Sequence, residues 1–129
     1  MTDGRTPGGP ERNAGRDRIS QYLAENGLAV AVRDLEPAAT GHTLIIPKRH
    51  SPSFFDLTPE EITACHALLR SERDQLAKAH RPDGYNIGVN DGVSAGQSIP
   101  HTHWHLIPRY HGDHPDPRGG VRHVIPTRR

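Results

Sequence analysis

Three histidines at alternate positions, His101, His103 and His105, are the feature that most constrains this chain. A spacing of two is the period of a β-strand, because successive side chains point to opposite faces of a sheet. On an extended backbone the three imidazoles share one face, with α-carbons roughly 6.6 Å apart at i and i+2. Thr102 and Trp104 then face the other side, toward the packed interior. The sequence therefore predicts a strand that presents three imidazoles to one small group.

The composition limits the class of protein. The 129 residues suffice for one domain with a modest core, although only 33% of them are hydrophobic. A formal net charge of +1 gives no reason to expect a nucleic-acid partner. Cys65 is the only cysteine, which excludes an intramolecular disulfide and a cysteine-based zinc site. Because the sequence has no apolar run of membrane-spanning length, we expect a cytoplasmic protein with no membrane contact.

Changes in composition divide the chain into three parts. Residues 1–17 contain almost nothing apolar to bury and are predicted to form a disordered leader. Residues 18–110 hold the patterned segments and are predicted to form the domain that carries the histidines. Residues 111–129 are rich in proline, glycine and arginine, and we expect an extended basic C-terminal tail.

Hydrophobic patterns predict four more strands. Residues 20–25 and 28–34 flank Asn26-Gly27, a strong signal for a two-residue hairpin, so we predict an antiparallel pair. A short helix over residues 17–24 is the alternative. The other two strands are predicted over residues 42–47 and 85–90.

One long helix, of about 21 residues, is predicted to begin at Thr58-Pro59-Glu60-Glu61. Threonine is a good N-cap, proline is favoured at the first helical position, and a glutamate three residues after the threonine completes a capping box. The predicted buried stripe consists of Ile62, Cys65, Leu68, Leu69 and Leu76. The predicted solvent face consists of Glu60, Glu61, Arg70, Glu72, Arg73 and Lys78.

Three imidazoles on one strand face allow three interpretations. They can hold zinc, but such sites usually have carboxylates that orient the rings, and none lies between Asp91 and Asp113. Alternatively, the backbone N–H groups, amide and hydroxyls of the preceding loop can cradle phosphate oxygens beside an imidazole nucleophile. The third interpretation is a strand whose histidines are only solvated. The donor-rich loop favours phosphoryl chemistry.

Residues 101–107 resemble the His-φ-His-φ-His-φ-φ signature (φ, hydrophobic) of the histidine triad superfamily of nucleotide hydrolases and transferases. Residues 34–50 are similar to the superfamily's second block, and residues 90–98 are similar to its phosphate loop. Residues 112–122 are similar to the tail of a bacterial branch described as diadenosine tetraphosphate hydrolase-like. The resemblance therefore extends over nearly all of the chain after the leader.

The resemblance implies an α+β fold, with an antiparallel sheet of about five strands, one long helix and a homodimer. It also implies that residues 20–25 form a strand. The implied activity is cleavage at the α-phosphate of nucleoside phosphoanhydrides or phosphoramidates through a nucleotidyl-histidine intermediate. Dinucleoside polyphosphates and adenosine phosphoramidates are the leading substrates, and no metal or other cofactor is implied.

The resemblance also assigns roles to single residues. His103 is the implied nucleophile, His101 positions it, and His105 contacts phosphate. His50 matches a further histidine that joins the triad in some branches. The implied substrate contacts are Asp34 at the ribose hydroxyls, and Asn90, Gly96, Gln97 and Ser98 at the phosphates.

Two alternatives to catalysis stay open. One is a non-catalytic nucleotide-binding subunit that keeps the pocket, and the other, less favoured, is a His-rich metal-binding protein. Two residues are expected to lie outside the site: His42, packed at the start of a strand, and Cys65, in the core.

Overall fold

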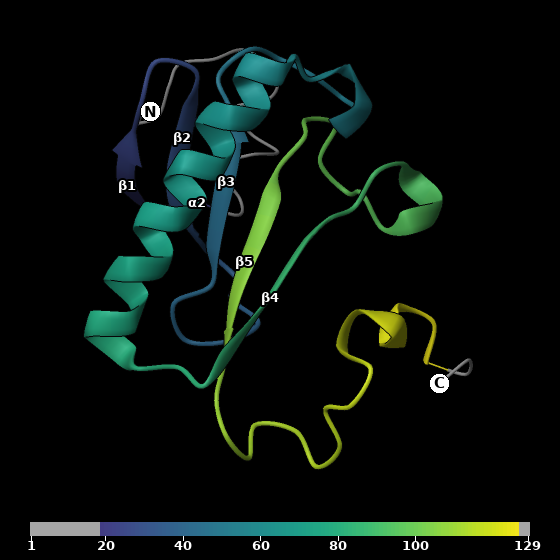
Figure 1. The fold of residues 1–129 in the computed structure, drawn as a ribbon. Coiled ribbons are helices and arrows are strands. Elements are labelled where there is room, and N and C mark those ends of the chain that lie inside the picture. Colours follow the sequence, from purple (N-terminus) through teal and green to yellow (C-terminus); the bar gives the residue numbers. More distant parts are fainter. Residues whose placement is uncertain (1–18, 127–129) are drawn as a thin grey trace.

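The computed structural model describes residues 19–126, and the leader predicted over residues 1–17 lies outside this range. One sheet of five antiparallel strands, in the order β1-β2-β3-β5-β4, is covered on one face by a long helix (Figure 1). The strands are β1 (Ile19–Glu25), β2 (Ala29–Asp34), β3 (Thr43–Pro47), β4 (Gly84–Val89) and β5 (Trp104–Arg109). The helix is α2 (Pro59–His80), and the 3-10 helices are η1 (Phe54–Asp56), η2 (Val93–Ala95) and η3 (Gly120–Val124). The expected α+β fold is confirmed.

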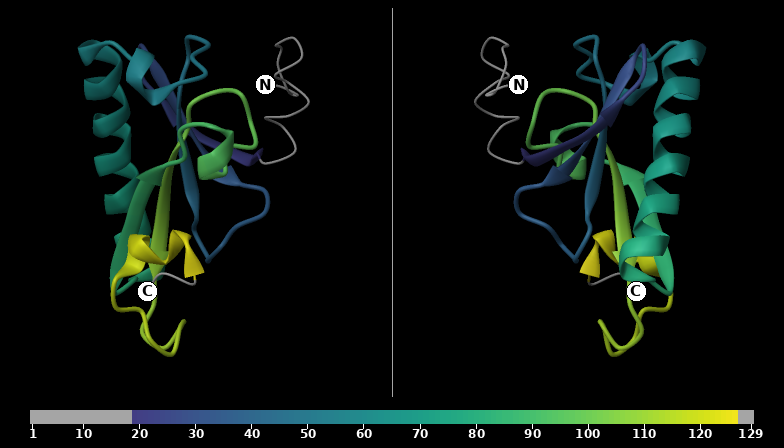
Figure 2. Two further views of the ribbon diagram at one scale, coloured as in Figure 1. Left: turned by 90° about the vertical axis from the view of Figure 1, so that its right-hand side faces the viewer. Right: turned by 90° about the vertical axis from the view of Figure 1, so that its left-hand side faces the viewer.

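The segment after β5 folds back over the sheet edge that β4 forms. In both views of Figure 2 it lies at the end of the sheet away from the helix N-terminus, and η3 packs beside β4. Part of the predicted extended tail is therefore a short helix placed over the strands.

The hairpin between β1 and β2 turns at Asn26, as predicted, but three residues and not two separate the strands. The Asn26 Oδ1 accepts hydrogen bonds from the backbone N–H groups of Leu28 and Ala29, at 3.1 and 3.0 Å. Its Nδ2 donates to the Ala64 carbonyl on α2 at 2.9 Å. One side chain thus closes the turn and ties it to the helix, and the alternative of a helix here is wrong.

Helix α2 begins with the predicted capping box. The Thr58 hydroxyl accepts from the Glu61 N–H at 3.1 Å, and the Glu61 carboxylate accepts from the Thr58 N–H at 2.8 Å. Pro59 occupies the first helical position, where its missing N–H costs nothing. The helix ends at Arg81, which adopts a left-handed conformation with φ of 48°.

Three side chains of α2 lie on the opposite side from the one predicted. Glu61 and Glu72 are buried, 4% and 5% exposed, and Ile62 is 37% exposed. Partners on other elements account for the difference. Arg49, from the loop after β3, donates two hydrogen bonds of 2.8 Å to the Glu61 carboxylate. Arg33 on β2 lies 4.0 Å from the Glu72 carboxylate, and burial raises the pKa of Glu72. Helical periodicity carries no information about partners on other elements.

We expect the substitution Glu61→Gln to lower the free energy of unfolding at pH 7 by about 1–2 kcal/mol, because the amide has one acceptor oxygen in place of two and carries no charge. Hydrogen bonds from Arg49 hold the pKa of Glu61 at about 2, below its ordinary 4.5. The carboxylate therefore stabilises the fold above about pH 4.5, and this contribution is lost as the pH falls toward 2. Urea denaturation at pH 7 and pH 3 measures both effects.

The matched control is Glu60→Gln, in the same helical turn but exposed. We expect it to change stability by less than about 0.5 kcal/mol. A Glu61→Gln protein as stable as the wild type at pH 7 would show that the Arg49 contact contributes nothing.

The core lies between α2 and the sheet. Ile45, Leu76, Leu106 and Cys65 are completely buried there. Burial raises the pKa of the Cys65 thiol to about 11, so this cysteine is an inert core residue, as expected. None of the helices within residues 19–126 combines the length and the hydropathy needed to cross a membrane.

Candidate active site

The three predicted histidines lie where the chain enters β5, and only His105 is within the strand. The strand begins at Trp104, because the Ser51 carbonyl accepts both the backbone N–H and the hydroxyl of Thr102, at 2.6 and 2.8 Å. The expectation of one uninterrupted strand through all three histidines is corrected. Thr102 and Trp104 are buried as predicted, 1% and 8% exposed.

His103 is held in one tautomer. Its Nδ1 lies 2.9 Å from the backbone carbonyl oxygen of His101. A carbonyl oxygen only accepts hydrogen bonds, so Nδ1 carries the proton and donates it. The neutral ring then has its lone pair on Nε2, the form in which an imidazole acts as a nucleophile. The backbone of His101, and not its ring, fixes this tautomer.

The ring of His101 is held between two backbone groups. The Ser51 N–H donates to Nδ1 at 3.1 Å, and Nε2 donates to the Pro47 carbonyl at 2.9 Å. The exposed His50 stacks on it, with ring centroids 5.2 Å apart and planes 6° apart. His50 therefore contacts the triad by stacking on the His101 ring.

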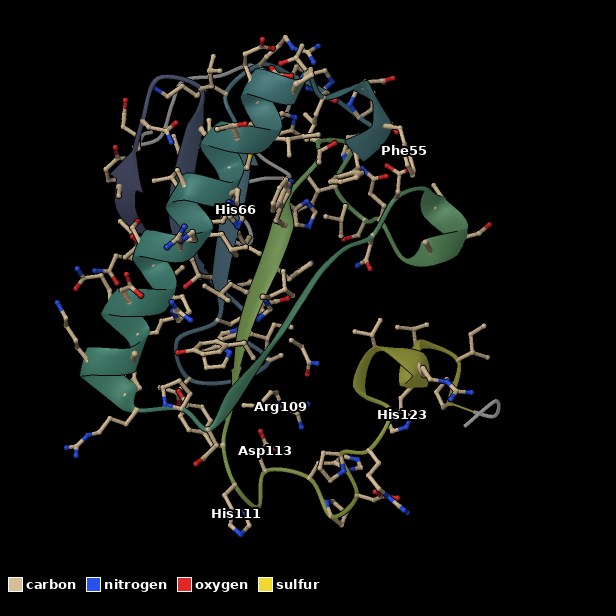
Figure 3. The ribbon with its side chains drawn as sticks, viewed as in Figure 1. Phe55, His66, Arg109, His111, Asp113 and His123 are labelled. Atoms are coloured by element: carbon tan, nitrogen blue, oxygen red, sulfur yellow. The ribbon has the colours of Figure 1, made fainter. Side chains whose placement is uncertain are left out.

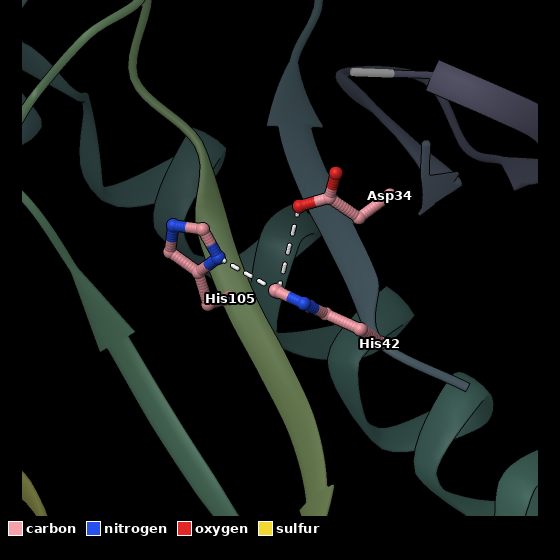
Figure 4. Close-up of side chains that lie close together, drawn as sticks. All are labelled: Asp34, His42 and His105. Carbon is pink, nitrogen blue, oxygen red and sulfur yellow. Dashed lines mark hydrogen bonds and ion pairs between the residues drawn. The ribbon is translucent and has the colours of Figure 1, made fainter. Parts of the chain in front are cut away.

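His105 is hydrogen-bonded to a fourth histidine, His42, which stands just before β3 (Figure 4). The backbone N–H of Ala38 donates to His42 Nδ1 at 3.0 Å, so the His42 proton is on Nε2. That proton points to His105 Nδ1, 2.9 Å away. His105 Nδ1 is thus an acceptor, and the neutral His105 ring carries its proton on Nε2. The ring that carries this N–H lies next to the ring of His103, with centroids 5.0 Å apart.

His42 is the site residue that the sequence interpretation left out. It is 4% exposed and follows Gly41 at the start of an aliphatic strand. A histidine at the start of an aliphatic strand is the one sequence signal for this role. Its partner, His105, lies 63 residues away, and strand pairing brings the two together. The pairing sets Leu44 of β3 opposite His105 of β5.

The carboxylate of Asp34 approaches the same pair. Its Oδ2 lies 3.7 Å from His42 Nε2, and its Oδ1 accepts the Glu36 N–H at 3.0 Å. Among the described residues, Asp34, His42 and His105 are the group that has ligand atoms close enough to hold a metal ion, all within 4.8 Å. A metal ion would bind the lone pair of His42 Nε2, so the proton of the ring would have to move to Nδ1. There it would face the Ala38 N–H, which is also a donor, and that hydrogen bond would be lost. The cluster is therefore arranged to hold a proton and fits a metal poorly.

The predicted phosphate loop, residues 90–98, is hydrogen-bonded to residues 52–54 at the start of η1. Asp91 accepts from the Phe54 N–H at 2.7 Å and from the Ser53 hydroxyl at 3.0 Å. The Gln97 amide accepts the Gly92 N–H and donates to the Pro52 carbonyl, both at 2.8 Å. The Gln97 side chain thus holds the loop in shape.

A cavity of about 980 Å³ opens beside His105. His42 lines it together with three of the predicted site residues, Asn90, Gly96 and His105. The other predicted site residues are not part of its lining: Asp34, His50, Gln97, Ser98, His101 and His103. His103 is 6% exposed, and its ring centroid lies 5.0 Å from that of His105, which does line the cavity.

Ionisable side chains also occur outside the lining of this cavity, and one of them, Arg109, donates from Nη1 to Oδ1 of the lining residue Asn86 at 2.7 Å. Figure 3 shows His66 on the outer side of α2, and His111 and His123 on the segment after β5. Arg109 and Asp113 face each other at the base of that segment, joined by hydrogen bonds of 2.8 and 2.9 Å. None of these groups reaches the triad.

Comparison with known proteins gives relatives over most of the chain. The asymmetrical bis(5'-nucleosyl)-tetraphosphatase of Schizosaccharomyces pombe is 40% identical over 94 residues, which cover 73% of this chain and 52% of the relative. The adenosine 5'-monophosphoramidase HNT1 of Saccharomyces cerevisiae is 39% identical over 87 residues, which cover 67% and 52%. The chain thus spans about half the length of these two relatives.

Solved structures have the same fold. The crystal structure of a HIT family protein from Bacillus anthracis superposes with a TM-score of 0.68 at 35% identity, covering 71% of this chain and 65% of that one. Residues 16–112 match the HIT domain. Since that match takes in the five strands, the long helix and all four histidines of the site, the chain belongs to the HIT family.

Proposed function

We propose that this protein is a nucleotide hydrolase or nucleotidyl transferase that acts at the α-phosphorus of nucleoside phosphoanhydrides or phosphoramidates. The hydrogen bond from His103 Nδ1 to the His101 carbonyl carries the proposal, because it leaves a lone pair on Nε2 without a separate base. The names of the two relatives support the substrate class: one is a dinucleoside tetraphosphatase and the other an adenosine monophosphoramidase. Dinucleoside polyphosphates and adenosine phosphoramidates are therefore the substrates to test. Within the family we propose the diadenosine tetraphosphate hydrolase-like branch.

In this mechanism His103 Nε2 attacks the α-phosphorus. The new P–N bond forms as the bond to the leaving group breaks, and the leaving group departs with the bonding electron pair and takes a proton from water. A water molecule then attacks the nucleotidyl-histidine, which releases the nucleoside monophosphate and restores the lone pair on Nε2. His105 donates from Nε2 to a phosphate oxygen, where negative charge grows.

The remaining predicted residues bind the substrate in this proposal. Asp34 accepts from the ribose hydroxyls, and the loop supplies donors to the phosphate oxygens. Asn90 and Gly96 line the cavity beside His105, and Gly96 has a φ of 94°, which favours glycine. Gln97 and Ser98 are the other two residues of the phosphate site in this proposal. Gln97 acts by holding the loop over residues 90–98 in the shape that presents its N–H groups.

We also propose a homodimer. β4 is an edge strand of the sheet, and an edge strand is able to pair with a second copy of the chain. Light scattering at two protein concentrations tests the assembly.

The test of the function is an assay of adenosine 5'-phosphoramidate and diadenosine tetraphosphate, with mass spectrometry of enzyme quenched during turnover. We expect hydrolysis of at least one substrate and a transient adenylyl adduct on the peptide that contains His103. Binding of nucleotide with no turnover of either substrate would favour the non-catalytic alternative.

We expect His42→Asn to lower kcat about 10²-fold with little change in KM, because His105 loses the donor that fixes its tautomer. Isothermal titration of a nonhydrolysable analogue separates this effect from lost binding. His66→Asn, on the outer side of α2, is the matched control and should behave as the wild type. An equal loss of kcat and of analogue affinity in His42→Asn would indicate a binding role instead.

A further inference from the structure

The loop between β2 and β3 carries the backbone N–H that sets the tautomer of His42, and much of this loop lies in solvent. Residues 35–38 are exposed, including Ala38, whose N–H donates to His42 Nδ1 at 3.0 Å. A loop with few buried contacts opens more easily than the strands that it joins. The N–H that His105 presents to the phosphate in the proposed mechanism therefore depends on what anchors this loop.

Two of the anchors are local. At the β2 end of the loop, Asp34 Oδ1 accepts the Glu36 N–H at 3.0 Å. At the β3 end, the Thr43 hydroxyl donates to the Gly41 carbonyl at 2.8 Å. Neither bond involves the carbonyl of Thr40, which lies in the turn between Ala38 and His42.

The third anchor comes from the residue that follows β5. The Tyr110 hydroxyl donates to the Thr40 carbonyl at 2.7 Å, across 70 residues of the sequence. Burial raises the pKa of Tyr110 above its ordinary 10, so the hydroxyl keeps its proton at neutral pH and acts as a donor. Because β3 and β5 are antiparallel, the loop before β3 and the residues after β5 meet at the same end of the sheet (Figure 1). The same pairing therefore brings His105 to His42 and Tyr110 to Thr40.

Tyr110 is itself held in a closed turn. The Asp113 carboxylate accepts the Tyr110 N–H at 2.9 Å and two N–H groups of Arg109, at 2.9 and 2.8 Å (Figure 3). The bonds from Arg109 hold the pKa of Asp113 at about 2, below its ordinary 3.8, so the carboxylate is charged and keeps the turn closed at neutral pH. The backbone that carries the phenol is thus fixed to the end of β5, and the bond to Thr40 restrains the exposed loop.

We propose that Tyr110 is a positioning residue, whose hydroxyl anchors the turn before β3 so that the Ala38 N–H keeps the His42 proton on Nε2, directed at His105. The inference rests on the proposed function, in which His105 donates to a phosphate oxygen. Tyr110 is not among the residues that line the cavity, so it acts through His42 and not through contact with the substrate.

The kinetic test uses Tyr110→Phe, which removes the hydroxyl and keeps the ring. We expect kcat for adenosine 5'-phosphoramidate to fall about fivefold with KM unchanged, the scale of one hydrogen bond between uncharged groups. In the His42→Asn background the same substitution should change kcat by less than about twofold, because the ring through which it acts is absent.

A second measurement does not depend on activity. In nitrogen-15 spectra of histidine-labelled protein at mildly alkaline pH, where imidazoles are uncharged, the wild-type His42 should show one tautomer, protonated on Nε2. In Tyr110→Phe the Nδ1 and Nε2 signals should move toward each other as the two tautomers mix. The matched control is Tyr85→Phe, which removes a tyrosine hydroxyl that lies 3.5 Å from the Arg73 carbonyl on α2. It should leave kcat and the spectra as in the wild type.

Unchanged His42 signals in Tyr110→Phe, or an equal fall of kcat in the wild-type and His42→Asn backgrounds, would overturn the inference while the proposed function stands. Changes of the same size in Tyr85→Phe would also overturn it, since they would indicate a general effect on the fold. Absence of turnover by the wild type would overturn the proposed function instead. The shift of the His42 signals in Tyr110→Phe would then still establish the anchor.

Discussion

Replacing His103 with alanine is expected to lower kcat by at least about 10⁴-fold and to leave nucleotide binding within a few-fold of the wild type. The reason is that the variant has no atom in place of Nε2, whose lone pair the His101 carbonyl secures in the wild type. His105 and the loop donors remain, so the phosphate is still bound. Single-turnover hydrolysis of adenosine 5'-phosphoramidate measures the loss, and calorimetry with adenosine monophosphate measures binding.

The matched control for this variant is His66→Ala, on the solvent side of α2, which should turn over as the wild type does. Circular dichroism establishes that both variants are folded. Hydrolysis by folded His103→Ala protein at a rate within tenfold of the wild type would remove the nucleophile assignment. The adenylyl adduct should disappear with the activity.

The second large effect is expected from Gly41→Ala, which should lower the free energy of unfolding by about 3 kcal/mol. Gly41 has a φ of 90°, and a β-carbon there would lie 2.7 Å from Leu76 Cδ2 and 3.3 Å from Pro108 Cγ. Both neighbours are fully buried, so neither moves without disturbing the core. Thermal denaturation should show a melting temperature about 10 °C lower or more.

Gly27→Ala is the control for this variant. Gly27 also lies in a turn, but its φ is outside the left-handed region and no heavy atom lies within 4 Å of an added β-carbon. We expect its stability to stay within about 0.5 kcal/mol of the wild type. Equal stability of the two variants would show that the turn before His42 tolerates a side chain.

Local signals in the sequence were sufficient for most elements of this fold, whereas the strand over residues 20–25 also required the family resemblance. The capping box at Thr58 and the hairpin residue Asn26 predict structures closed by hydrogen bonds between residues two or three apart. The alternation of Thr102 and Trp104 with the histidines likewise predicted which side chains enter the core. Each of these depends on neighbours in the chain, so the sequence contains them directly.

Predictions that depended on distant neighbours were wrong or incomplete. Helical periodicity placed Glu61 and Glu72 in solvent, whereas arginines from other elements hold them in the interior. The strand through the histidines was predicted to be continuous, but the Ser51 carbonyl takes both donors of Thr102 before β5 begins. In each case a group about 10 to 50 residues away decided the outcome.

The sequence by itself determined the five strands, the capped helix and the histidines around which the site is built, because short-range patterns and a family signature encode them. Only the tertiary structure decided the state of those histidines. The Ala38 N–H sets the tautomer of His42, the antiparallel register of β3 and β5 brings His42 to His105, and together they leave a donor on His105. Hydrogen-bond partners separated by 63 residues are selected by strand register, which no local pattern specifies.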